Sequence, residues 1–233
     1  MFGLYFFFIK VAISHGNVRI ALHALQVEPA CAKVHTSDER QNSLHFALMH
    51  NSPIELVNEL LACWPEAALV KTKTQELTPL HVVMQQSSTD ATIAAIQAIV
   101  AVCPTATAIK NVHGNTPLHH GLEHGAHVDS ISALIRASPK ELRMKNESGD
   151  TPLHLAVRCE NPFETIAAVY GAWQVGSRFF FTLTSRLSSS LFHHASSNGS
   201  VLQHQHKPAT AIHAWTYADA QTTLSVYHTQ CNT

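Results

Sequence analysis

The sequence predicts an all-α solenoid of helix–turn–helix–loop units, followed by a disordered or poorly structured C-terminal segment. One observation is the phrase TPLH, which occurs at residues 78–81, 116–119 and 151–154, with a weaker copy, NSLH, at 42–45. The other is a proline that stands 15 or 16 residues before each of the four histidines: Pro29, Pro65, Pro104 and Pro139. The histidines recur every 35 to 38 residues, each with its proline upstream, which indicates one structural unit repeated along the chain.

Each unit carries two apolar segments. After NSLH, a short apolar segment is followed by a break at Asn51 and Ser52, and a longer segment then runs to the next proline. The apolar residues of the longer segment recur at the spacing of one helix face: Ile54, Val57, Leu60 and Leu61. The pattern predicts a short helix, a tight turn, a longer helix and an extended polar loop in every unit.

The phrase TPLH predicts the start of the first helix of a unit. Threonine at the N-cap accepts a hydrogen bond from a free amide of the first turn, and proline at the next position lacks the amide that would go unpaired. The leucine enters the core, and the imidazole can bond to nearby backbone. Because every unit needs them once, we interpret these residues, together with His45, as structural: Thr78, Pro79, His81, Thr116, Pro117, His119, Thr151, Pro152 and His154.

Four stretches of the sequence resemble the ankyrin repeat family. They are HGNTPLHHGLEHG at 113–125, SGDTPLHLAVRCE at 148–160 and, as weaker copies, LTPLHVVMQQ at 77–86 and NSLHFALMHN at 42–51. The resemblance implies an ankyrin-type solenoid that binds other proteins.

The earlier loops depart from the family pattern. The glycine that precedes TPLH in this family is present as Gly114 and Gly149, whereas Glu76 and Gln41 occupy about the same place in the earlier units. We therefore expect the earlier loops to differ from the family's tight turn.

The repeat register divides the chain into three regions. Residues 1–10 form an apolar N-terminus outside the repeats, and residues 176–233 form a serine- and histidine-rich tail without helical periodicity. Between them, residues 11–175 contain five units: 11–35, 36–71, 72–109, 110–144 and 145–175. The first of these units is truncated.

The first unit is expected to lack the TPLH start. Alignment through the prolines places Ile9 over His45, and three phenylalanines at residues 6–8 stand in place of the phrase. Three more follow the last unit at residues 179–181. One hypothesis is that one or both ends are translated non-coding sequence and that the chain is a fragment of a longer array. Transcript reads that encode the second phenylalanine run would contradict it.

Composition narrows the function classes. Charged residues make up 13% of the chain and its net charge is -1, so no basic surface for nucleic acid is expected. The five cysteines form no CxxC pair, and the odd number disfavours a closed disulfide framework, which favours a reducing, cytoplasmic setting. The apolar start is shorter than the roughly 20 residues that a membrane helix needs, so no membrane association is expected.

Candidate chemistry is sparse. His120, His124 and His127 have the spacing of three ligands on one helix face, but Gly121 and Gly125 weaken such a helix, so no metal site is expected.

A catalytic site is not expected either. Cys159 lies five residues after His154, which does not place the two on a common face. Neither a phosphate-binding loop nor a paired-carboxylate motif is present, so neither catalytic residues nor a cofactor are expected.

The predicted function is that of a non-catalytic protein-interaction scaffold. Stacked repeats form a curved solenoid whose loops and first helices line a concave face. The resemblance places contacts at the fourth and fifth positions after the LH histidine, and the loop tips add three more: Met49, His50, Gln85, Gln86, Glu123, His124, Arg158, Cys159, Lys73, His113 and Asn146. Two alternatives remain open, a regulatory repeat fragment of a larger enzyme or channel, and a histidine-dependent metal-binding protein.

Overall fold

The computed structural model describes residues 2–36, 38–86 and 90–174, which all lie in one compact unit, Met1–Arg178. Within these residues the regular elements are helices, and no strand occurs. The predicted all-α class is confirmed. The tail predicted for residues 176–233 lies outside the described residues.

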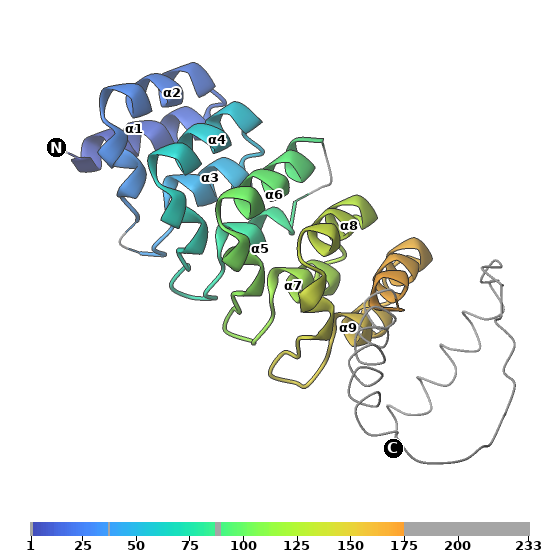
Figure 1. Ribbon diagram of the computed structural model, residues 1–233. Coiled ribbons are helices and arrows are strands. Elements are labelled where there is room, and N and C mark those ends of the chain that lie inside the picture. The colour runs from blue at the N-terminus through green and yellow to red at the C-terminus, as the bar shows by residue number, and fades with distance from the viewer. Residues whose placement is uncertain (1, 37, 87–89, 175–233) are drawn as a thin grey trace, which may run out of the picture. The chain divides into compact units, whose positions relative to one another are not determined.

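The helices that begin the units lie side by side in one row (Figure 1). They are α1 Phe2–Ser14, α3 Ser43–Met49, α5 Pro79–Val83, α7 Pro117–Glu123 and α9 Pro152–Arg158. The leucines of the LH pairs in α3, α5 and α7 are at most 1% exposed, and burying one such side chain contributes about 2 kcal/mol. Packing along the row thus stabilises helices of five to seven residues, which would be too short to persist alone.

The longer helices form a second row, each packed against the next. They are α2 Val18–Val27, α4 Ile54–Cys63, α6 Asp90–Val102 and α8 Val128–Ala137, and residues 163–174 are also helical. In α4 the predicted apolar face is buried at Val57, Leu60 and Leu61, while Ile54 is half-buried.

A proline follows each of these second helices from α2 to α8. The residue before the proline has φ between -150° and -132° and ψ between 79° and 87°, because the proline ring disfavours helical conformation at the preceding residue. A short 3-10 turn then starts at the proline: η1 Pro29–Lys33, η2 Pro65–Leu69, η3 Pro104–Ala108 and η4 Pro139–Arg143.

A residue with positive φ forms the turn between the two helices of four units. These residues are Gly16 (φ 68°), Asn51 (φ 48°), Gly125 (φ 68°) and Glu160 (φ 50°). The amide of the following residue donates to a carbonyl five positions earlier, as from Asn17 to Ala12 (2.7 Å) and from Ser52 to Ala47 (2.9 Å).

The first unit is shifted by one residue from its predicted alignment. With Gly16 over Asn51, Ile9 falls over Leu44 and Lys10 takes the place of His45. The burial pattern agrees, since Ile9 and Leu44 are 0% and 1% exposed. The alignment of Ile9 with His45 was wrong because the turn between α1 and α2 is one residue shorter than the turn between α3 and α4. Helix α1 also runs across the expected boundary between residues 10 and 11.

Each loop before a first helix is closed by an amide-to-carbonyl hydrogen bond. The bonds are Thr36 to Gln41 (2.9 Å), Thr72 to Leu77 (2.9 Å), Asn111 to Asn115 (2.9 Å) and Asn146 to Asp150 (3.0 Å). The two earlier loops therefore enclose one residue more than the two later ones, as expected from their sequences.

All four loops share one backbone feature. The residue two positions before the N-cap has positive φ, whether it is glycine, as at Gly114 and Gly149, or not, as at Arg40 and Glu76. The equivalent of the family glycine in the second unit is thus Arg40 rather than Gln41. A Cβ added at Gly114 would lie 2.7 Å from the backbone nitrogen of Glu147 in the next loop. Residue 114 must therefore be glycine for two reasons, its positive φ and the close approach of that loop.

Candidate functional site

A histidine links each of three units to the next. Nε2 of His81 donates to the carbonyl of Asn115 (3.0 Å), and Nδ1 accepts from the backbone amide of Thr78 (3.2 Å). Because a carbonyl can only accept, the proton lies on Nε2 and the ring is neutral. The same link joins two further pairs: His45 to Leu77 (3.2 Å) and His119 to Asp150 (3.1 Å).

Burial keeps these linking histidines uncharged. It lowers the pKa of His45, His81 and His119 from the ordinary 6.5 to about 4. With both ring nitrogens of His81 engaged inside the protein, the geometry fits a structural role and leaves no free base for catalysis on that ring.

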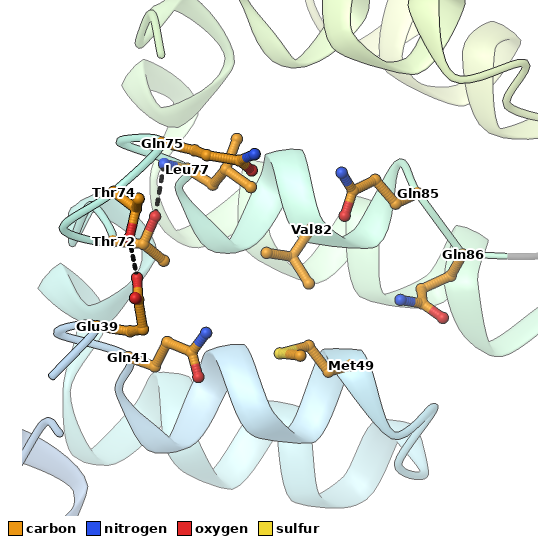
Figure 2. A pocket seen from close by; sticks show the side chains of 10 residues that line it. All are labelled: Glu39, Gln41, Met49, Thr72, Thr74, Gln75, Leu77, Val82, Gln85 and Gln86. Atoms are coloured by element: carbon orange, nitrogen blue, oxygen red, sulfur yellow. Dashed lines mark hydrogen bonds between the residues drawn. The ribbon is translucent and has the colours of Figure 1, made fainter. Parts of the chain in front are cut away.

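The first of two neighbouring hollows lies between α3 and α5 and has a volume of about 420 Å³ (Figure 2). It is lined by both helices and by the loops before them: Glu39, Gln41, Met49, Thr72, Thr74, Gln75, Leu77, Val82, Gln85 and Gln86. Met49 and Val82 lie across from one another in it, and at the loop end the hydroxyl of Thr74 donates to the carboxylate of Glu39.

The second hollow lies beyond the ends of α5 and α7 and also measures about 420 Å³. Its lining is Met84, Gln85, Gln86, His124, Gly125, Ala126 and His127. Gln85 and Gln86 belong to both hollows, so four of the predicted contact residues share one stretch of surface. We call Met49, Gln85, Gln86 and His124 the hollow row.

Other predicted contact residues lie at the ends of the first helices, outside the two hollows. His50 is exposed just after α3, and Glu123 is exposed at the end of α7. Cys159 is exposed just after α9, where Arg158 pairs with Asp150. Most residues that line the hollows were not predicted from the sequence, because they come from adjacent units and no single motif contains them.

The loop-tip residues join neighbouring loops. The amide of Lys73 donates to the carbonyl of Glu39 (2.8 Å), and the carbonyl of His113 accepts from the amide of Glu147 (3.3 Å).

Asn146 has a similar place, because its side-chain amide donates to Oδ1 of Asn115 (2.9 Å) and its own Oδ1 accepts from the amide of Asp150 (2.9 Å). The side chains of Lys73 and His113 are exposed, whereas Asn146 is half-buried. Of the three, Asn146 therefore has the least surface to offer to a partner.

The three histidines with ligand spacing do not share one helix face. Helix α7 ends at Glu123, and the positive φ of Gly125 turns the chain. His127 becomes the N-cap of α8, where its Nδ1 accepts from the amide of Asp129 (3.3 Å). His120 and His124 remain together, with ring centroids 4.3 Å apart.

Comparisons with known proteins identify the repeats. A family model described as ankyrin repeats (3 copies) matches residues 44–141, and no match is found among curated proteins. Within the described residues, no helix has the length and apolar character to cross a membrane. The matched residues run from α3 through most of η4, and α1, α2 and α9 pack on their neighbours in the same arrangement outside them. Residues 44–141 therefore consist of ankyrin repeats.

Proposed function

We propose that the chain is a non-catalytic protein-interaction module that binds its partner along the hollow row. Ankyrin repeats are in general protein–protein interaction modules. The observation that carries the proposal is that two hollows of about 420 Å³ each adjoin at Gln85 and Gln86. They provide a continuous recessed surface across three successive first helices.

The first hollow combines apolar and polar groups. Leu77 and Val82 contribute apolar side chains at 8% and 5% exposure, and Met49, at 44% exposure, is an adaptable apolar contact. Gln41, Gln75, Gln85 and Gln86 surround them with amides that can both donate and accept hydrogen bonds. This combination suits an extended polypeptide segment, whose side chains are partly apolar and whose backbone needs donors and acceptors.

The charge of the surface favours a protein over nucleic acid. Among the residues that the structure describes, Glu39 is the only charged one that lines the first hollow, and no lysine or arginine lines the second. A nucleic-acid site depends on lysine and arginine contacts to phosphates.

A cross-linking pull-down from native cells tests the proposal. The full chain is compared with the double variant Met49→Ala, Gln86→Ala, and with a control variant, Asn58→Ala, Gln97→Ala, whose residues are exposed on the second helices α4 and α6. We expect one partner to be captured by the parent and the control and lost by the hollow variant. Equal capture by all three, or capture by none, would reject the hollow row as the binding surface.

A further inference from the structure

A buried histidine beside the hollow row has an unpartnered ring nitrogen. His120 of α7 is 4% exposed, and its Nε2 lies 2.9 Å from Nε2 of Gln85. No hydrogen-bond partner of its Nδ1 is found within the described part of the chain. A buried polar atom left without a partner is destabilising, and a bound ligand can offset this cost.

Two exposed side chains with metal-ligand chemistry lie next to this histidine. One ligand atom from each of His120, Glu123 and His124 can be chosen so that all three lie within 4.8 Å of one another. The rings of His120 and His124 stand at 68° to each other. Residues three and four positions apart share one side of a helix end, which explains why these three converge while His127 does not.

Neighbouring amides hold two members of this cluster. Nδ2 of Asn115 donates to Oε2 of Glu123 (2.7 Å), which leaves Oε1 for another contact. Nε2 of His120 faces the side-chain amide of Gln85. When Nδ1 binds a metal, Nε2 carries the ring proton, so the Gln85 amide must turn over and accept that proton through its Oε1. Metal-binding imidazoles and carboxylates typically have such second hydrogen-bond partners, which orient the ligand atom.

We propose that Nδ1 of His120, the carboxylate of Glu123 and the imidazole of His124 bind a divalent transition-metal cation, for which zinc is the best match. Two imidazoles and one carboxylate form a common protein ligand set for zinc and leave a fourth position open to water or to a side chain of a partner. Ligand atoms on tetrahedral zinc lie about 3.4 Å apart, so the exposed Glu123 and His124 side chains move inward by about 1 Å on binding.

This site goes beyond the proposed protein interaction and does not depend on it. His124 belongs to the hollow row, so a bound cation would add a positive centre to the second hollow. The sequence signal is the spacing of His120, Glu123 and His124, which is interpretable only once α7 is known to end at Glu123.

Isothermal titration of the full chain with Zn²⁺ at pH 7 tests the site. The variants are His124→Ala and Glu123→Gln, both at exposed positions, and the matched control is His50→Ala. His50 follows α3 as His124 follows α7, but Phe46 stands four residues before it. The chain holds 18 histidines, so the result that matters is the difference between these matched variants.

We expect one zinc-binding event in the parent and in His50→Ala that is weakened by about tenfold or more in His124→Ala and Glu123→Gln. A second control, His127→Ala, removes a histidine of the same hollow that lies outside the cluster and should leave zinc binding unchanged. No zinc uptake by the parent, or identical titrations of His124→Ala and His50→Ala, would overturn the proposal. Circular dichroism of each variant checks that the helices persist.

Discussion

The unit of α1 and α2 and the unit of α5 and α6 reach the same packing through different contacts. In the later unit, Thr78 precedes the helix and His81 links it to the next unit. In the first unit, Lys10 takes the histidine position, and its Nζ lies 4.0 Å from the ring centroid of Phe46 in α3. One unit thus makes its link by a hydrogen bond and the other by a cation–π contact.

The two units share a set of buried apolar side chains. Their first helices bury apolar side chains at equivalent positions: Ile9, Ala12 and Ile13 in the first unit, and Leu80, Val83 and Met84 in the later one. The comparison teaches that this pattern suffices to pack a first helix into the row, and that the TPLH phrase adds the cap and the link.

Lowering the pH should destabilise the units that are linked by histidine, and we expect this change to have the largest effect on the free energy of unfolding. The pKa of His45, His81 and His119 is about 4 in the folded chain and 6.5 ordinarily, so between these values the unfolded chain binds more protons. Stability is therefore full above pH 6.5 and falls towards pH 4, by as much as about 3 kcal/mol for each histidine.

Urea unfolding at pH 7, 6 and 5 measures this loss. The window above pH 5 is chosen because ordinary carboxylates titrate below it. A free energy of unfolding that stays constant from pH 7 to pH 5 would contradict the neutral, buried state of the three rings.

Exchanging the linking residues should show that the two links differ in strength. His81→Ala leaves the amide of Thr78 without its partner and removes one of the two hydrogen bonds that the carbonyl of Asn115 accepts, and we expect it to lower the free energy of unfolding by about 3 kcal/mol. Lys10→Met keeps an apolar chain over Phe46 and removes only the charge, for an expected loss of about 1 kcal/mol. Denaturant unfolding at pH 7 compares them, and equal losses would mean that the histidine bonds contribute no more than the cation–π contact.

The smallest effects are expected at the turns, where the units share one backbone conformation but not one residue. Gly125→Ala should lower the free energy of unfolding by about 1 kcal/mol, because φ is +68° and nothing lies within 4 Å of the added Cβ. Glu160→Gly, at φ 50°, should raise it by up to about 1 kcal/mol, since relief of the left-handed strain exceeds the added chain entropy. Thermal melting of both variants shows whether each substitution lowers or raises stability. Two changes in the same direction would reject the explanation by backbone conformation.

The fold could be predicted from sequence because its signals are local. The threonine, proline and leucine of TPLH and the proline after each second helix act within a few residues of where they stand, so their repetition gives the unit. The first unit was misaligned by one residue because Lys10 and Ile9 carry no such signal, and the turn that shifts them contains one residue fewer.

The candidate surface was only partly predictable. Met49, Gln85, Gln86 and His124 follow from their place after the LH histidine, but the hollows arise from how adjacent units meet, as where Met49 lies across from Val82. The convergence of His120 with Glu123 was missed because the sequence spacing directed attention to His127, which the turn at Gly125 carries away.

The histidine links end on main-chain oxygens. The three acceptors, Leu77, Asn115 and Asp150, have different side chains, and each directly precedes the N-cap of the next unit. Because every residue supplies a carbonyl, a unit gained by gene duplication or lost by deletion finds its acceptor without a compensating mutation in its neighbour. The array can thus change length over evolution while the side chains along its surface diverge freely.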